Sequence, residues 1–228
     1  MKKIIIFCLI PFLSFCECRS KLSTIPTGTW TYRLLVNGAA IGKAVVTNAL
    51  SNNLYISTTD MEMDAGYIKN TTRQVITETT DFKPVKLEVY NKTMQNERVS
   101  EMKTIANFTG NKVDLDTGGA RSTITIEKPF ILEGNYFMSE LIMNEFKNGT
   151  IIKNYIYEPS VDIEEPVLML VKVLGRREVS IKGKTKNLIH LGFSIENLKN
   201  IDSYIDENGI TQKTVITMLN NRLELVLE

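Results

Sequence analysis

The sequence is poor in the side chains that most often carry catalysis and metal binding. Its 228 residues include one histidine and three cysteines. A single histidine cannot supply a multi-histidine metal site. The sequence also contains no glycine-rich phosphate loop, no GxSxG nucleophile elbow and no HExxH zinc motif. These absences exclude most enzyme classes that sequence alone can identify, and no reaction can be named from the residues.

Neither sign of charge is in excess. The chain has 27 Lys and Arg against 26 Asp and Glu, which gives a formal net charge of +1. Domains that bind nucleic acid usually carry a basic excess or a basic stripe, so we expect no nucleic-acid partner. With 43% hydrophobic and 23% charged residues, the composition is otherwise that of an ordinary globular domain.

The only long apolar run lies at the N-terminus. Lys2 and Lys3 precede an apolar stretch over residues 4–15. This stretch is too short for a transmembrane helix, because about 20 apolar residues are needed to cross the hydrocarbon core. A basic start followed by a short apolar run is typical of an export signal. We therefore expect residues 1–18 to be a cleaved signal.

The end of this signal resembles the cleavage box of a bacterial lipoprotein. Leu13, Ser14 and Cys16 match its Leu-small-small-Cys pattern, whereas Phe15 departs from it because a small residue is usual there. We expect lipidation at Cys16 and attachment to the membrane through this N-terminal lipid anchor. A soluble exported product and an uncleaved anchor are the alternatives. Glu17, where an aspartate would favour inner-membrane retention, favours the outer membrane, so we expect an exported protein of the periplasm or outer membrane.

The cysteines are confined to this N-terminal segment. Cys8 lies inside the signal, and only Cys16 and Cys18 would survive its removal. Residues 19–228 contain no cysteine, so a disulfide framework, a zinc–cysteine cluster and a cysteine nucleophile are excluded from the folded part. We expect no cofactor.

After a short polar tether at residues 19–27, the pattern is that of β-structure almost throughout. The runs are rich in Thr, Val, Ile and Tyr, and they are separated by hairpin-length turns such as Asn37–Gly38. This close spacing predicts antiparallel meander connections in a single domain over residues 28–228. We predict strands at residues 29–36, 41–50, 54–63, 67–80, 85–94, 98–108, 112–115, 122–126, 151–157, 167–174, 178–181, 187–195, 203–205, 211–218 and 223–227.

One segment has the period of a helix. Its apolar stripe consists of Phe137, Met138, Leu141, Ile142 and Phe146. The stripe predicts a helix at about residues 136–147, with Asn135 as the N-cap and Gly149 as the stop. The natural cover for its wide apolar face is the concave side of a sheet. The predicted fold class is therefore mainly β: an antiparallel, strongly curved sheet or half-open barrel wrapped around one helix.

The hairpin at residues 28–42 resembles the opening of a bacterial family of exported β-rich proteins with a domain of unknown function. That opening has the form G-x-aromatic-x-Y, a short strand, NG or WG, a small-residue stretch and a second glycine, which Trp30, Tyr32 and Gly42 match. Similar features recur through residue 228, including Phe82-Lys83-Pro84 and the turn at residues 206–210. The resemblance implies a curved sheet similar in shape to periplasmic lipoprotein-carrier half-barrels. It indicates fold more than chemistry.

Three polar features favour structural roles over chemistry. His190 lies on a predicted strand with no motif around it. Asp60, Glu62 and Asp64 alternate on a strand, so we expect them to face solvent rather than to form a calcium loop. The basic stretch at residues 172–186 is typical of a solvated hairpin, and contact with anionic lipid headgroups is the alternative.

A curved sheet of a dozen strands can enclose more space than one short helix fills. The remainder would be an apolar pocket for a hydrophobic small molecule or lipid. Its predicted lining is Trp30, Tyr32, Met138, Leu141, Ile142, Phe146 and Tyr157. We therefore expect a non-enzymatic envelope protein that binds such a ligand, or an envelope partner, in its concave face. The alternative is a structural or protein-interaction module in which these side chains are ordinary core; a hydrolase is not favoured.

Overall fold

The computed structural model describes residues 25–132, 134–159, 162–195, 199–218 and 221–228, so the expected signal and Cys16 lie outside the described residues. The N-terminal half forms β1 (Gly28–Val36), β2 (Ala39–Ser51), β3 (Leu54–Asp64), β4 (Ile68–Thr79), β5 (Pro84–Gln95), β6 (Arg98–Thr109), β7 (Lys112–Thr117) and β8 (Ala120–Thr125). The helix α1 (Asn135–Met143) follows. The C-terminal half forms β9 (Ile151–Ile156), β10 (Val167–Ile181), β11 (Lys184–Ile195), β12 (Lys199–Ile205), β13 (Thr211–Met218) and β14 (Asn221–Leu227).

All fourteen strands belong to one antiparallel sheet. Their order is β8-β7-β6-β5-β4-β3-β2-β1-β14-β13-β12-β11-β10-β9. Each half is a meander of hairpins, and the two halves join where β1 pairs with β14, with Tyr32 opposite Leu227. The two free edges, β8 and β9, are consecutive in the chain and are connected through the segment that contains α1.

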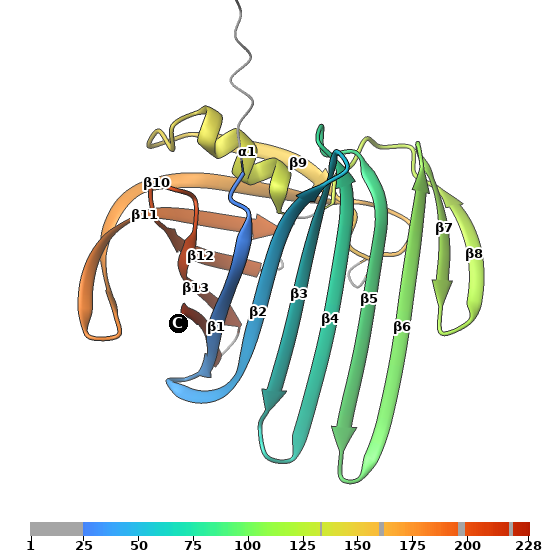
Figure 1. The fold of residues 1–228 in the computed structure, drawn as a ribbon, viewed down its shortest axis with the longest axis horizontal. Helices are drawn as coiled ribbons and strands as arrows, with labels where there is room; N and C mark the ends of the chain where they lie inside the picture. Colours follow the sequence, from blue (N-terminus) through green and yellow to red (C-terminus); the bar gives the residue numbers. More distant parts are fainter. Residues whose placement is uncertain (1–24, 133, 160–161, 196–198, 219–220) are drawn as a thin grey trace, which may run out of the picture.

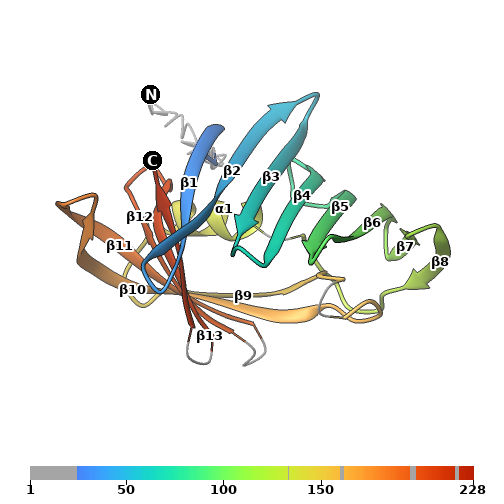
Figure 2. The same ribbon diagram turned by 90° about the horizontal axis from the view of Figure 1, so that it is seen from below.

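This topology explains the position of the helix. The sheet curls on itself without closing, and α1 lies at one end of the curl, between the two halves of the sheet (Figures 1 and 2). The connection from β8 to β9 therefore inserts a helix where a closed barrel would pair its edge strands. The prediction of an antiparallel, strongly curved sheet around one helix is confirmed. Within the described ranges, no helix combines the length and apolarity that crossing a bilayer requires.

The number of strands differs from the prediction at one place, and some ends differ as well: β12 begins at Lys199 rather than at residue 203. The predicted strands 167–174 and 178–181 are a single strand, β10, because the ladder with β11 continues across the interruption. The register shifts between Val173 and Gly175, and Gly175 has a φ of +99°. Glycine adopts such an angle without steric cost, so the strand accommodates a bulge there and continues.

The helix prediction is also wrong at both ends. Asn135 is the first helical residue and Gly134 is the N-cap, while the helix ends at Met143 rather than near residue 147. The amides of Phe146 and Glu145 donate to the carbonyl oxygens of Leu141 and Ile142 at 2.9 Å each. These are the two bonds of a Schellman ending, and they place Glu145 and Phe146 in the left-handed region, with φ of +51° and +50°.

The buried apolar side chains of the described residues form four clusters, and the largest of them contains side chains of the helix. Phe137 and Leu141 of α1 pack among β9–β12, where Val171 and Leu191 are fully buried. A second cluster joins β4–β7 to the segment after β8 and to Tyr157. The start of α1 and the concave face of β1–β7 line the candidate site.

Candidate functional site

A single row of side chains crosses seven strands on the face that α1 covers. Each member stands opposite the next in the strand register, so all of them point to the same side of the sheet. The row consists of Trp30, Val46, Thr59, Gln74, Val89, Thr104 and Thr117. It contains no charged residue, and it forms the floor of the site.

Two cavities share this floor. One, of about 470 Å³, lies over Trp30, Val46, Thr59 and Gln74. The other, of about 380 Å³, begins at Thr59 and Gln74 and continues to Thr117. Because the cavities have two lining residues in common, we treat them as one concave groove that runs from β1 to β7.

The rows on either side of the floor are also uncharged. Tyr32 lines the first cavity, and Met61, Thr72, Asn91 and Met102 line the second. The Thr72 hydroxyl donates to Asn91 Oδ1 at 2.8 Å. Hydroxyl and amide groups thus alternate with methionine and valine along the groove, which makes its surface amphipathic.

The first turn of α1 roofs the groove above β2 and β3. Gly134, Asn135 and Met138 line the first cavity from this side. Met138 packs against the turn between β12 and β13, where a Cβ on Gly209 would lie 2.8 Å from the Met138 sulfur. Glycine at this position therefore allows the turn to close on the helix.

A closed ring of three hydrogen bonds fastens this turn to the sheet. Asn48 Nδ2 donates to Asn135 Oδ1 at 3.3 Å, Asn135 Nδ2 donates to the Ser57 hydroxyl at 3.1 Å, and that hydroxyl donates to Asn48 Oδ1 at 2.9 Å. Asn48 also donates to the Pro26 carbonyl at 2.8 Å, which brings the end of the expected tether against the groove. The helix has no capping side chain of its own, so this ring supplies the fastening.

A buried carboxyl group lies beside the ring. Glu78, near the end of β4, is 0% exposed and stands opposite Tyr55 in the register. Among the described residues, no group donates a hydrogen bond of normal geometry to either carboxyl oxygen. Burial raises the pKa of Glu78 to about 7; the Asn135 amide lowers it, but by less. The Asn135 amide also donates to Ser57, and it compensates the buried carboxyl only in part.

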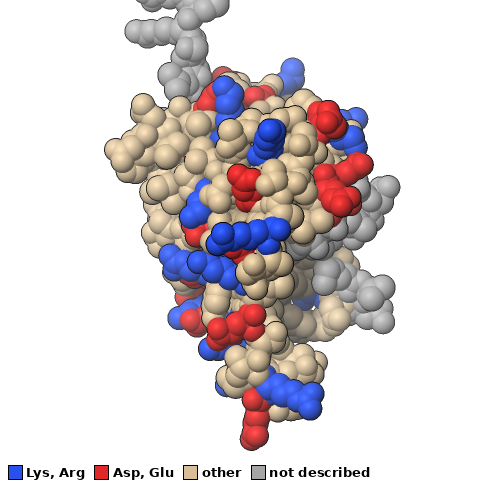
Figure 3. Space-filling view, turned by 90° about the vertical axis from the view of Figure 1, so that its right-hand side faces the viewer, with Lys and Arg blue, Asp and Glu red and all other residues tan. Residues whose placement is uncertain are grey.

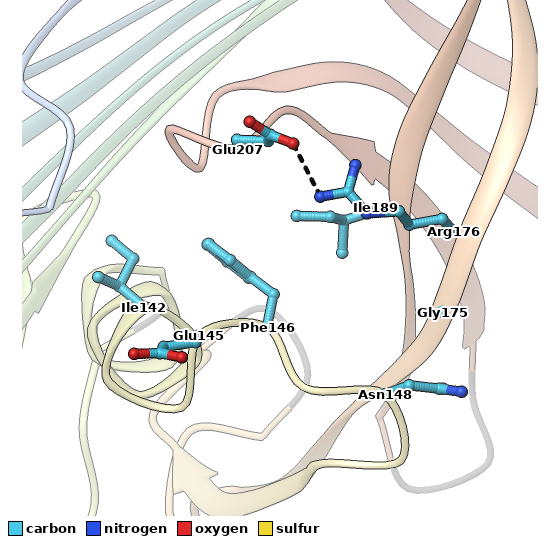
Figure 4. A pocket seen from close by; sticks show the side chains of 8 residues that line it. All are labelled: Ile142, Glu145, Phe146, Asn148, Gly175, Arg176, Ile189 and Glu207. Carbon is cyan, nitrogen blue, oxygen red and sulfur yellow. Dashed lines mark hydrogen bonds and ion pairs between the residues drawn. The ribbon is translucent and has the colours of Figure 1, made fainter.

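A further cavity, of about 620 Å³, lies behind the C-terminal end of α1. Ile142 and Phe146 approach it from the helix, and Ile189 approaches it from β11 (Figure 4). An ion pair of 2.9 Å between Arg176 and Glu207 borders it. This cavity shares no lining residue with the concave groove.

The seven residues predicted to line one pocket lie in three different places in the structure. Trp30, Tyr32 and Met138 line the concave groove. Ile142 and Phe146 line the cavity behind the helix. Leu141 and Tyr157 are buried in two of the core clusters and line neither. The sequence did not reveal the polar groups of the groove, Asn48, Ser57 and Gln74, or the buried Glu78 beside them. The available signal was alternation along each strand, because each of these residues lies two positions from another residue of the same face, as Asn48 does from Val46 and Gln74 from Ile76.

The other polar features of the sequence lie away from the groove. His190 Nε2 contacts Asp202 Oδ1 at 2.7 Å, and its ring stacks on Tyr204 at 4.8 Å. The three alternating carboxylates each form an ion pair: Asp60 with Arg73, Glu62 with Lys43 and Asp64 with Lys69.

In the described part of the chain, many charged side chains are paired with opposite charges, and potential metal ligands are not grouped. In the basic stretch, Arg176 pairs with Glu207, and Lys186 donates to Gln212 at 2.8 Å. On the side of β7 and β8, acidic and basic groups are interleaved (Figure 3). No three histidine, cysteine or carboxylate side chains of the described ranges are arranged to hold a metal ion.

Comparison with protein-family models gives no match. Comparison with curated proteins gives none either. Among solved structures, the chain is similar to the crystal structure of a beta-barrel-like protein of domain of unknown function DUF1849 from Brucella abortus. The likeness has a TM-score of 0.66 and 15% sequence identity, and it covers 90% of this chain and 97% of that chain. At this identity it shows the fold alone: a β-rich, barrel-like domain of unknown function.

Proposed function

We propose that this β-rich, barrel-like domain is a non-enzymatic binding protein that holds an elongated amphipathic molecule, a lipid or its acyl chain, in the concave groove. The observation that carries the proposal is the uncharged floor that runs unbroken under two cavities from Trp30 to Thr117. We further propose, from the sequence, that the protein acts in the bacterial envelope from a lipid anchor at Cys16.

The dimensions of the groove support a long, thin ligand. Its floor crosses seven strands, and six spacings of about 4.8 Å give a length of about 29 Å. The two cavities, of about 470 and 380 Å³, are within the size range of small-molecule sites. An extended acyl chain fits this shape.

The chemistry of the lining supports an amphipathic ligand. Trp30, Met61 and Met102 offer polarizable apolar surface that adapts to a flexible chain. Between them, Gln74 and Asn91 offer amide groups for hydrogen bonds. A purely structural module would fill this space with its own side chains, and it is the alternative that the following experiment separates.

The experiment uses Trp30, the only tryptophan of the chain, as a reporter at one end of the groove. A lysophosphatidylcholine with a brominated acyl chain is titrated into the protein, because bromine quenches tryptophan fluorescence on contact. We expect saturable quenching that the unbrominated lipid reverses by competition. Quenching that does not saturate, or that the competitor does not reverse, would contradict the proposal.

A matched pair of variants locates the site. Thr59 is on the floor, and Thr58, its neighbour on β3, points to the opposite face of the sheet. Thr59→Phe fills the middle of the groove and should weaken lipid binding by about tenfold or more, because about 1.4 kcal/mol of lost contact suffices. Thr58→Phe adds the same ring outside the groove and should leave binding unchanged. Equal effects of the two variants would exclude the groove as the site.

A further inference from the structure

The first turn of α1 is held by tertiary contacts rather than by its own sequence. It has no capping side chain and no acidic residue, so its free amides gain nothing locally. The hydrogen-bonded ring through Asn135 holds it from one side. Tyr136 packs edge-on against Phe82, which stacks on Tyr55 of β3, with ring centres 6.0 and 5.9 Å apart.

The helix is anchored from Phe137 onward. Phe137 and Leu141 are 3% and 1% exposed, and they belong to the core cluster with β9–β12. Gly134, just before the helix, has a φ of +108° and no atom within 4 Å of an added Cβ. Residues 134–136 precede this anchor, so they can move about Gly134 while the helix from Phe137 onward stays in place. This movement would unroof the part of the first cavity that Gly134 and Asn135 line.

Glu78 lies where it can drive this movement. Its carboxyl group is fully buried, and the Asn135 amide offsets only part of the cost of burial, so the ionised form is unfavourable unless water reaches it. From β5 it faces Pro84, and from α1 it faces the uncharged amide of Asn135. From β3 it faces Tyr55, whose pKa is raised by burial and then by the charge of Glu78. Tyr55 thus remains neutral when Glu78 ionises.

The other charged groups of the neighbourhood act elsewhere. Glu140 of α1 raises the pKa of Tyr136, after burial, whereas the pKa of Glu78 is shifted by burial and by Asn135. Asp81 and Lys83, in the turn between β4 and β5, form an exposed ion pair of 2.7 Å with each other. Glu78 is therefore the one buried carboxyl group next to the ring in the described part of the chain.

We propose that Glu78 and the start of α1, residues 134–136, form a proton-operated gate on the concave groove, closed when the carboxyl is protonated and opened when it ionises. Ionisation draws water to Glu78, the Asn135 ring breaks, and residues 134–136 lift from β2 and β3. Lipid then exchanges freely, whereas protonation returns these residues to the sheet and retains the lipid. This proposal rests on the proposed function of the groove.

The test follows the release of brominated lysophosphatidylcholine from the groove by Trp30 fluorescence at about pH 6 and about pH 8. This zwitterionic lipid does not titrate in that range, so a change in release reports on the protein. With a Glu78 pKa of about 7, the ionised fraction rises about tenfold between these two pH values, and release from the wild type should accelerate by a similar factor. Glu78→Gln should release slowly at both.

Two further variants complete the test. Asn135→Ala breaks the ring and should release quickly at both pH values, which makes the proposal testable even where Glu78→Gln folds poorly. Glu62→Gln removes the same charge from an exposed ion pair and should behave as the wild type does. Release that is independent of pH in the wild type, or equally dependent on pH in Glu78→Gln, overturns the gate and leaves lipid binding intact.

Amide hydrogen exchange measures the opening of the gate in the absence of lipid. The Met138 amide donates to the Gly134 carbonyl at 3.3 Å across the gate, and the Asn144 amide donates to the Glu140 carbonyl at 3.1 Å in the anchored end. The ratio of the two exchange rates cancels the intrinsic effect of pH. A ratio that rises from pH 6 to pH 8 in the wild type alone supports the gate even if no lipid binds; a constant ratio overturns it.

Discussion

Replacing Glu78 with glutamine should change how the stability of the protein depends on pH. Burial raises the pKa of this carboxyl from 4.5 to about 7 in the folded protein. Between these two values the folded state binds more protons than the unfolded state, so the free energy of unfolding falls as pH rises. The stabilising contribution is complete below about pH 4.5 and is lost as pH passes about 7. Glutamine resembles the protonated acid and does not titrate.

The magnitude follows from the shift. A shift from 4.5 to about 7, at 1.36 kcal/mol per pKa unit, amounts to about 3 kcal/mol. Relative to the wild type, Glu78→Gln should therefore gain up to about 3 kcal/mol of stability between about pH 4 and about pH 8. The buried amide adds an offset of its own, but this offset is the same at every pH and cancels in the comparison.

The assay is urea denaturation followed by circular dichroism, across this pH range, for the wild type, Glu78→Gln and Glu62→Gln. Each variant differs from the wild type at one residue, so the effects of the groups they share cancel in the differences. Glu62 is exposed and paired with Lys43, and its replacement should give a profile parallel to that of the wild type. A Glu78→Gln profile that is also parallel would refute a titrating buried carboxyl at this position.

Three further predictions concern other parts of the chain. Gly42→Ala should destabilise the protein by about 3 kcal/mol in urea denaturation, because the new Cβ would lie 1.9 Å from the Glu62 carbonyl oxygen on β3; an unchanged midpoint would contradict this close approach. Lys213→Met should cost about 2 kcal/mol at neutral pH, because it leaves the largely buried Glu224 with one partner fewer. Burial opposes ionisation of Glu224, but Lys213 and Arg222 together lower its pKa, so the wild type loses this stabilisation as pH falls and the variant should lose less of it. Cys16→Ser should release the protein from the membrane fraction in cell fractionation, and native mass spectrometry should show that the variant lacks the mass of the lipid carried by the wild type. A variant that keeps the added mass would rule out lipidation at this residue.

Local features of the fold could be predicted because each is specified by neighbouring residues. Asn37–Gly38 predicts a hairpin, and both residues have positive φ, +49° and +85°. The apolar stripe at residues 137–146 predicts the helix, although hydrogen bonds of the Schellman ending stop it earlier than the stripe does. The prediction placed a break between two strands near Gly175. In the structure the glycine adopts the backbone angle of a bulge, and the two predicted strands are one.

The candidate site was predicted only in part, for a physical reason. Sequence periodicity tells which residues share a face of a strand or helix, and the structure has Trp30 and Tyr32 of β1 and Met138 of α1 lining the groove. Periodicity does not tell which apolar side chains meet others across the fold, so Leu141 and Tyr157, which are core, could not be separated from residues that line a cavity.

By itself, the sequence of this protein determined an antiparallel β-meander with one amphipathic helix, since both patterns arise from residues close together in the chain. Only the tertiary structure decided that β1 pairs with β14, that the helix is inserted between the free edges, and that seven strands align one uncharged row. It also decided that Glu78, an ordinary acidic residue in a polar strand, is fully buried. These outcomes depend on pairings between distant segments, whose register is set by packing of the whole sheet rather than by any local run of residues.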